Sequence, residues 1–243
     1  MILDAKSALV TGAAQRLGAQ IARTLHQNGA NLIIHYRKSK AAAEDLVGEL
    51  NELRDGSSIA VSADLADLNQ IEKLASDAIS AFGKLDILVN NASAFYPTPI
   101  GSIDMQAGND LLASNYRAPL FLAQACHATL KESTGCIINL TDIYANQPLD
   151  KHSVYCSAKA ANQMLVKSLA IELAPEIRVN GIAPGAILWP EESNIEYQQA
   201  MTQKIPLARA GSPQEIADTV VFLASNAYVT GEIIRVDGGR QLQ

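Results

Sequence analysis

The 243-residue sequence contains no uninterrupted apolar run of the roughly 18 residues that a membrane-spanning helix needs. It also has no excess of basic residues, because 19 Lys and Arg stand against 25 Asp and Glu, for a formal net charge of −6. Nucleic-acid binding relies on clustered cations, so this balance argues against DNA or RNA as the main partner. The opening residues, MILDAKSALVTG, show no secretion leader, and we expect a cytoplasmic protein without a membrane partner.

Cysteine is scarce as well, with three residues and no CxxC spacing. An odd, unpaired set excludes a disulfide framework and gives no indication of a metal site. We therefore expect no bound metal, and we expect Cys126, Cys136 and Cys156 to be reduced thiols in the core.

What the sequence does contain is a regular series of short apolar segments. Val, Ile and Leu follow one another in these segments with little alternation, which is typical of strands buried on both faces of a parallel sheet. The predicted strands cover residues 7–10, 31–35, 58–63, 85–91, 135–141, 177–184 and 232–236.

Helical segments with start and stop signals lie between these strands. Asp67 with Gln70 has the pattern of a capping box, and Gly83 supplies the left-handed position that ends the helix. Ser212 begins another helix in the same way. The alternation of strand and helix predicts a single α/β domain over residues 1–243, with a doubly wound Rossmann-type fold.

Within this domain we expect a cofactor half over about residues 1–140, followed by a catalytic helix and substrate loop over about 141–210. The segment 186–210 has no periodicity and is predicted to be an active-site loop or a short helical flap, because long loops in compact domains are usually functional. Trp189 in this segment either covers the site or serves packing.

The first strand ends in TGAAQRLG, residues 11–18, and runs directly into a helix from Leu17 to Asn28. A glycine-rich turn between a strand and a helix brings backbone N–H groups and the positive helix end close to a pyrophosphate. Two glycines in a tight turn also occur for structural reasons alone, but the position after the first strand predicts a dinucleotide site.

The end of the second strand distinguishes the two nicotinamide cofactors. A site for NAD places Asp or Glu there to bind the ribose 2′-hydroxyl. The residues here are instead His35, Tyr36, Arg37, Lys38 and Ser39. Cations stand where a 2′-phosphate needs them and no acid repels it, which predicts NADPH or NADP+. Asp64, at the end of the third strand, suits the adenine amino group.

Tyr155 and Lys159 stand about one helical turn apart in a strongly helical stretch. A neighbouring ammonium favours the phenolate, so we expect it to lower the pKa of the tyrosine. Together the pair can pass a proton to a substrate while a cofactor passes hydride. An exposed helix pair without chemistry is the alternative, and the glycine turn, the NNA of 90–92 and the Pro184-Gly185 step argue against it.

Over essentially its whole length the chain resembles the short-chain dehydrogenase/reductase family. The residues that carry the resemblance are Thr11, Gly12, Gly18, Asn90, Asn91, Ala92, Asn115, Tyr155, Lys159, Pro184, Gly185 and the VDGG of 236–239. The resemblance implies a seven-stranded parallel sheet with helices on both faces, a nicotinamide cofactor, a proton relay through Asn115, Lys159 and Tyr155, and a homotetramer.

Three positions depart from the general pattern of that family. Arg16 replaces a glycine of the turn, Ser93 replaces the glycine that usually follows NNA, and Asp142 replaces a catalytic serine. A carboxylate would repel the oxyanion that develops in carbonyl reduction, so Asp142 argues against a simple ketone as substrate. It suits a nitrogen heterocycle, whose N–H groups can donate to the carboxylate and whose reduction needs a proton on nitrogen.

These departures, together with NNASAFYPTP, HYRKS and DIYANQPL, resemble the pteridine reductases of the family. The implied reaction is NADPH-dependent reduction of dihydropterins, biopterin- or monapterin-like, to tetrahydro forms, with oxidised pterins and dihydrofolate as further candidates. The implied catalytic residues are Asp142, Tyr155, Lys159 and Asn115. The implied substrate residues are Arg16, Ser93, Phe95, Asp142 and Tyr155, with Phe95 stacking on the pterin. The cofactor residues are Gly12, Arg16, Leu17, Gly18, His35, Tyr36, Arg37, Lys38, Ser39, Asp64, Leu65, Asn91, Ala92, Ser93, Tyr155, Lys159, Pro184 and Gly185.

Two other functions fit the general motifs. A carbonyl reductase of the same family is one, and Asp142 and Phe95 are the residues that argue against it. A non-catalytic NADPH-binding sensor is the other, and an intact set of Tyr155, Lys159 and Asn115 makes it the weaker alternative.

Overall fold

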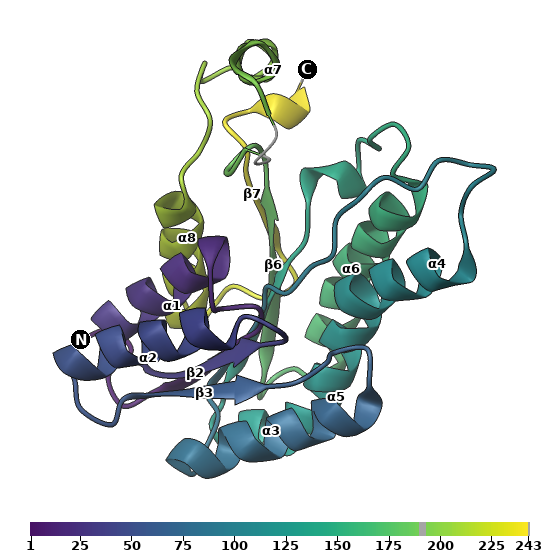
Figure 1. The fold of residues 1–243 in the computed structure, drawn as a ribbon. Coiled ribbons are helices and arrows are strands. Elements are labelled where there is room, and N and C mark those ends of the chain that lie inside the picture. Colours follow the sequence, from purple (N-terminus) through teal and green to yellow (C-terminus); the bar gives the residue numbers. More distant parts are fainter. Residues whose placement is uncertain (190–192, 243) are drawn as a thin grey trace.

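The computed structural model describes residues 1–189 and 193–242. In these residues seven parallel strands form one sheet in the order β3-β2-β1-β4-β5-β6-β7 (Figure 1). Each predicted strand overlaps an observed one, so the predicted doubly wound α/β fold is confirmed. The strands are β1 (Ser7–Val10), β2 (Asn31–Tyr36), β3 (Ser58–Ser62), β4 (Ile87–Asn90), β5 (Cys136–Leu140), β6 (Arg178–Pro184) and β7 (Ile233–Val236).

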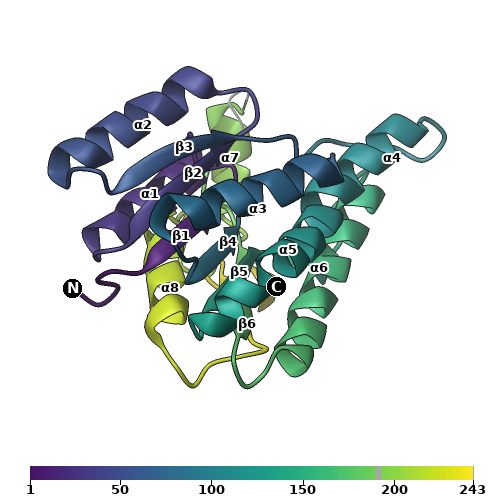
Figure 2. The ribbon, with the colours of Figure 1, turned by 90° about the horizontal axis from the view of Figure 1, so that it is seen from below.

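Helices cover both faces of the sheet, which explains why its strands are apolar on both sides (Figure 2). One face carries α1 (Arg16–Gln27), α2 (Lys40–Leu53) and α8 (Pro213–Ser225). The other carries α3 (Leu68–Phe82), α5 (Ala118–Glu132) and α6 (Ser153–Glu172). Successive side chains of β1 divide between the two cores, because Ala8 and Val10 pack under α1 while Leu9 packs on the opposite side.

Shorter elements gather around the carboxyl ends of the strands. They are α4 (Met105–Leu112), the π-helical turn η1 (Ala113–Arg117), the 3₁₀ turns η2 (Ile143–Ala145) and η3 (Arg240–Leu242), and α7 (Ile195–Thr202). Helix α7 lies in the segment 186–210, where a loop or a helical flap was expected; residues 190–192 of that segment lie outside the described residues. Figure 1 shows α7 next to the C-terminal turn, beyond the ends of β6 and β7.

Of the three helix start and stop signals predicted from the sequence, two are confirmed and one is wrong. Gly83 ends α3 with a φ of 72°, and Ser212 opens α8 with a capping box, both as predicted. The capping box predicted for Asp67 and Gln70 is wrong. Asp67 does accept a bond from the backbone of α3, but the Gln70 side chain donates to the Asp67 carboxylate and accepts from the Asp64 N–H at 2.7 Å. Gln70 therefore bonds to Asp64, just after β3, and its side chain does not make the return bond to the Asp67 backbone that a capping box requires.

The three cysteines are free and buried, as predicted. Burial raises the pKa of Cys126 to about 12 and that of Cys136 to about 11, so both are neutral thiols at physiological pH. Within residues 1–189 and 193–242, no cluster of His, Cys, Asp and Glu could hold a metal ion. None of the helices in the same residues combines the length and apolar character needed to cross a membrane.

The amino ends of β1 and β4 are joined through one carboxylate. Asp86 is only 2% exposed, and its Oδ1 accepts from Lys6 Nζ at 2.8 Å. Its Oδ2 accepts from the Ser7 N–H at 2.9 Å and lies 3.1 Å from Lys84 Nζ. Burial raises the pKa of Asp86, but the bonds from Lys6, Ser7 and Lys84 outweigh burial and hold it below its ordinary value.

We therefore expect Asp86→Ala to lower the free energy of unfolding at pH 7 by about 2–3 kcal/mol, because charged hydrogen bonds and a buried N–H lose their partner. The depressed pKa means that this contribution is present above the unfolded-state value and is lost as the pH falls through the folded-state value. Urea denaturation at several pH values measures both effects. Asp77→Ala, which breaks an exposed pair with Lys73, is the control and should cost under about 0.5 kcal/mol; equal losses in the two variants would contradict the prediction.

Candidate active site

Three asparagine side chains form a chain of hydrogen bonds beneath the carboxyl edge of the sheet, and the chain ends on the backbone carbonyl of a fourth asparagine. Asn90 of β4 donates to Asn139 of β5 at 2.8 Å, and Asn139 donates to Asn162 of α6 at 2.8 Å. Asn162 in turn donates to the backbone carbonyl of Asn115 in η1 at 2.9 Å. All four residues are buried. The chain therefore ties the two central strands to the helix and the π-helical turn that carry predicted catalytic residues.

The side chain of Asn115 fixes the direction of one further hydrogen bond. Its Nδ2 donates to the carbonyls of Ala94 at 2.9 Å and Leu111 at 3.0 Å, so its Oδ1 must point the other way. There it accepts from the Ser93 hydroxyl at 2.7 Å. The Ser93 proton is therefore committed to Asn115, and only the lone pairs of Ser93 remain to meet a ligand. The predicted relay from Asn115 to Lys159 stays a prediction.

A cavity of about 460 Å³ lies over the carboxyl ends of β1, β2, β3 and β4. It is bordered by the glycine turn, the start of α1 and the start of η1. Its lining includes most of the predicted cofactor residues, namely Gly12, Arg16, Leu17, Gly18, His35, Tyr36, Arg37, Ser39, Asp64, Leu65, Asn91, Ala92 and Ser93. It also includes residues that sequence reasoning missed, namely Ala14, Gln15, Ala66, Ala94, Asp110, Ala113 and Ser114.

The glycine turn has the properties of a phosphate cradle. Helix α1 begins without a side-chain cap and without an acid in its first turn, so its N–H groups and positive end face the cavity. Gly12 has a φ of +61°, and a Cβ on Gly18 would lie 2.3 Å from the Gly12 carbonyl. Arg16, also at positive φ, lines the same cavity. The residues present therefore fit the pyrophosphate of a dinucleotide.

The end of β4 supports this turn. Thr11 Oγ1 accepts from the N–H groups of Asn91 at 2.9 Å and Ala92 at 3.0 Å. The Asn91 side chain donates back to the carbonyls of Thr11 at 2.8 Å and Gly12 at 3.1 Å. Through these bonds Asn91 and Ala92 hold the glycine turn in place, and the same two residues line the cavity.

His35 is placed differently from a phosphate-binding residue. Its Nδ1 accepts from the Gly12 N–H at 3.0 Å and its Nε2 donates to the Ala63 carbonyl at 3.1 Å, which fixes the neutral tautomer. Burial lowers its pKa to about 4, and the ring is only 2% exposed. His35 therefore braces the turn and carries no charge toward a cofactor, while its assignment as a cofactor-binding residue stays a prediction.

The cations at the end of β2 separate into two kinds. Arg37 and Ser39 line the cavity, and Arg37 lies 4.0 Å from the Asp110 carboxylate of α4. Asp110 also accepts from the Tyr96 hydroxyl at 2.9 Å. Of the described residues that were predicted to bind cofactor, Lys38 is exposed and lies outside the lining of this cavity. Arg37 is thus the cation of this pair that is placed to reach a bound phosphate.

Tyr155 and Asp142 form the polar centre next to the cavity. The Tyr155 hydroxyl donates to Asp142 Oδ2 at 2.6 Å, and Asp142 Oδ1 accepts from the Tyr144 N–H at 2.8 Å. Lys159 Nζ donates to the Leu140 carbonyl at 2.8 Å and lies 5.7 Å from the centroid of the Tyr155 ring. Pro184 and Gly185 stand further along the same edge, at the end of β6.

The expected lowering of the Tyr155 pKa is wrong. Burial and the adjoining Asp142 carboxylate raise the pKa of Tyr155 well above its ordinary value. The ammonium of Lys159 does not reverse this, because it is bound to a carbonyl while the carboxylate touches the hydroxyl itself. Burial also raises the pKa of Asp142 and lowers that of Lys159 to about 8. Tyr155 is therefore protonated at physiological pH.

Phe95 stands beside this centre, outside any helix or strand, as the sequence suggested. Its ring meets the Tyr155 ring edge-on, with centroids 4.8 Å apart and an interplanar angle of 78°. On another side it stacks on His152, with centroids 4.8 Å apart and an angle of 16°. Half of the side chain is exposed, at 50%. His152, which the sequence gave no reason to single out, thus supports an aromatic wall that a flat ring could use.

The sequence is similar to a family of reductases and to individual oxidoreductases over nearly its whole length. Residues 12–241 match the family model described as enoyl-(acyl carrier protein) reductase. The chain is 38% identical over 277 aligned residues to pteridine reductase 1 of Leishmania tarentolae, covering 97% of this chain and 96% of that one. It is 36% identical over 240 residues to a 3-oxoacyl-acyl-carrier-protein reductase of Staphylococcus aureus, covering 96% and 97%. An oxidoreductase of Methylorubrum extorquens is 35% identical over 245 residues, covering 98% of each chain.

These relatives share nearly the full length of the chain. The cavity, the proton-holding Tyr155 and the adjoining Lys159 together provide what a hydride-transfer reaction needs from a protein. The chain therefore belongs to the short-chain dehydrogenase/reductase family and is an oxidoreductase that uses a nicotinamide cofactor.

Proposed function

We propose that the protein is an NADPH-dependent pteridine reductase that converts dihydropterins, biopterin- or monapterin-like, to their tetrahydro forms. Fully oxidised pterins and dihydrofolate are further candidate substrates. The observation that carries the proposal is the Asp142–Tyr155 hydrogen bond of 2.6 Å, which puts a carboxylate where carbonyl reductases of the family have a serine. The similarity to pteridine reductase 1 of Leishmania tarentolae supports the same conclusion.

The hydrogen-bonding character of the site favours a substrate rich in donors. Asp142 offers carboxylate oxygens, and Ser93 offers lone pairs because its proton is committed to Asn115. A ketone oxygen is itself an acceptor and would meet acceptors here. A pterin presents an amino group and ring N–H groups, which complement both residues.

The cofactor would be held by the residues that line the cavity. The pyrophosphate fits the turn from Gly12 to Gly18 with Arg16, and a 2′-phosphate fits the cationic end of β2 at Arg37 and Ser39. Asp64 follows β3, the strand next to β2, and lines the same cavity, where it suits the adenine amino group. When bound, NADPH supplies the hydride.

Tyr155 supplies the proton. Its raised pKa makes it a weak acid, so it gives up its proton only to a strong base. A ring nitrogen that becomes an anion when its C=N bond takes up hydride is a stronger base than the alkoxide formed from a ketone. Lys159, still largely protonated at pH 7 with a pKa of about 8, then stabilises the phenolate. The Asp142–Tyr155 pair thus favours reduction at C=N over reduction at C=O.

A carbonyl reductase is the second candidate, and the similarity to the 3-oxoacyl-acyl-carrier-protein reductase is the observation that favours it. A screen of NADPH oxidation with dihydrobiopterin, dihydromonapterin, dihydrofolate, an acetoacetyl thioester and simple ketones separates the candidates. Turnover of the thioester with no response to any pterin would replace our proposal by the second one. Binding of NADPH without turnover of any compound would indicate a non-catalytic sensor.

The proposed preference for NADPH can be tested at Arg37. We expect Arg37→Ala to raise the KM for NADPH about tenfold or more while leaving the KM for NADH nearly unchanged, because it removes a cation from the phosphate. Steady-state kinetics with both cofactors measures this. Lys38→Ala is the matched control, since Lys38 is the exposed neighbour. Equal use of both cofactors by the unmodified enzyme would refute the assignment.

The role of Phe95 can be tested by truncation. We expect Phe95→Ala to weaken dihydropterin binding by about 1–3 kcal/mol through lost stacking and burial, with little change in the KM for NADPH. Ile100→Ala, an exposed change in the same loop, is the control. Unchanged KM values for every pterin tested would show that the ring does not contact the substrate.

The proton-donor role of Tyr155 predicts a separation of binding from chemistry. Tyr155→Phe should reduce kcat by at least about a hundredfold, because no other group holds a proton at that position. Cofactor affinity, measured by NADPH fluorescence, should stay within about threefold of wild type. Tyr228→Phe removes a hydroxyl from a fully exposed residue and serves as the control. Near-normal turnover in Tyr155→Phe would overturn the assignment.

A further inference from the structure

The C-terminal turn η3 is fastened to the loop that carries Asp142. Gln241 Nε2 donates to the Ile143 carbonyl at 2.9 Å, and the Gln241 N–H donates to Asp237 at 2.9 Å. These bonds place Arg240, one residue earlier, beside Tyr144 and near Asp142. Arg240 therefore belongs to the surroundings of the catalytic pair, although it is remote from it in the sequence.

The groups that contact the Arg240 guanidinium carry no negative charge. Its Nη2 donates to the Tyr144 hydroxyl at 3.0 Å and lies 3.8 Å from the sulfur of Met201. The guanidinium carbon lies 5.6 Å from the centroid of the Tyr144 ring. The side chain is half-buried. A partly desolvated cation is thus held between a phenol and a thioether, neither of which carries charge.

Two sides of this guanidinium remain available to a ligand. Among residues 1–189 and 193–242, no group accepts a hydrogen bond from Nε or Nη1 of Arg240, and no carboxylate lies within 4.0 Å of it. Arg178 shows the contrast, because its guanidinium donates to the carbonyls of Leu223, Val229 and Ala224. The charge of Arg240 acts on Asp142, but the Asp142 carboxylate already accepts hydrogen bonds from Tyr144 and Tyr155.

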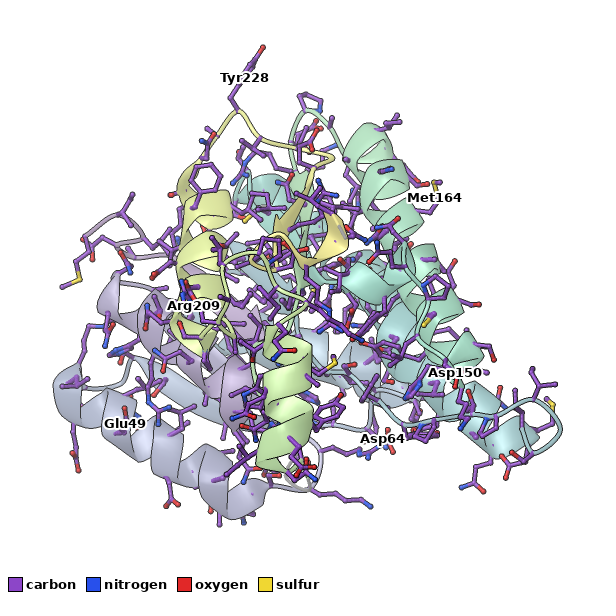
Figure 3. The ribbon with its side chains drawn as sticks, turned by 90° about the horizontal axis from the view of Figure 1, so that it is seen from above. Glu49, Asp64, Asp150, Met164, Arg209 and Tyr228 are labelled. Carbon is purple, nitrogen blue, oxygen red and sulfur yellow. The ribbon has the colours of Figure 1, made fainter. Side chains whose placement is uncertain are left out.

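Aromatic and thioether side chains stand near Arg240. Met201 and Tyr197 stand one turn apart in α7, and the Tyr197 ring meets Trp189 edge-on with centroids 6.4 Å apart. Figure 3 looks down on α7 and the C-terminal turn side by side, with Arg209 away on the α8 side, where it pairs with Glu215. Trp189, Tyr197, Met201 and Tyr144 therefore make an aromatic and thioether wall, which we call the α7 wall, next to a single unpaired cation.

We propose that Arg240 and the α7 wall form a subsite for a carboxylate that the substrate carries on a flat, aryl-containing side chain. The inference rests on the proposed function, because the heterocycle must be at Asp142 and Tyr155 for its side chain to extend over Tyr144. A carboxylate matches the two free N–H edges of a guanidinium, and an aryl linker matches the wall. A small neutral side chain with hydroxyl groups would leave the charge unmatched.

The test compares two substrates that share a dihydropterin ring, dihydrofolate with its acidic tail and dihydrobiopterin with a neutral one. We expect Arg240→Gln to lower the ratio of kcat/KM for dihydrofolate to that for dihydrobiopterin about tenfold, and Arg240→Lys to restore most of it. Arg235→Gln, an exposed change on β7 whose side chain bonds Gln241, should leave the ratio unchanged.

A second readout does not depend on turnover. p-Aminobenzoylglutamate, which carries the acidic tail and the aryl group without a pterin, should bind the NADPH-saturated enzyme and lose about tenfold in affinity in Arg240→Gln, as measured by calorimetry. If no pterin is turned over, the proposed function fails, and this binding measurement alone decides on the subsite. An unchanged substrate ratio, equal losses for both substrates, or tail binding that is indifferent to Arg240 would each overturn the subsite.

Discussion

The direction of a few buried hydrogen bonds determines what this active site offers to a ligand. From Asn90 through Asn139 and Asn162 the amide groups donate in one direction, ending on the carbonyl of Asn115. Turning the Asn115 side chain around would leave the carbonyls of Ala94 and Leu111 without a donor, at a cost of about 1–3 kcal/mol for each buried group. Because the amide is locked, Ser93 must donate inward, and its lone pairs face outward. The selectivity for donor-bearing rings that we propose would thus depend on hydrogen bonds in the interior of the protein.

Two positive side chains and one carboxylate lie at opposite ends of the site. Arg16 and Arg37 border the cavity that fits a dinucleotide, where phosphates are expected. At the other end the Asp142 carboxylate stands against Tyr155, and burial raises the pKa of both groups. The same carboxylate that discourages a developing alkoxide also keeps the phenol protonated until a stronger base arrives. In the function that we propose, the single replacement of a serine by Asp142 would account for both the disfavoured and the favoured chemistry.

Much of this could be predicted because it depends on local sequence. Strands buried on both faces are apolar throughout, and the ends of parallel strands meet at one edge, so the turn at Gly12 and the NNA segment had to converge. The rest depends on which side chains meet in space. The raised pKa of Tyr155 follows from its burial and from the Asp142 carboxylate that contacts its hydroxyl, and the supporting contact of His35 is with the Gly12 N–H. Arg240 and His152 give no signal in the sequence, because their neighbours lie in distant segments.

The central position of β1 has a consequence for how the site is assembled. Its partner β4 lies far along the chain, since the bond from Ser7 to Asp86 spans 79 residues and that from Asn91 to Thr11 spans 80. Closing so long a loop is entropically costly and slow, and until it closes Thr11 and Gly12 lack the amide that shapes their turn. The cofactor cradle and the Phe95 segment that follows β4 therefore both depend on the pairing of β1 with β4. Capacity to bind a dinucleotide is then a reporter of the completed fold, and a dinucleotide stabilises the whole domain by mass action.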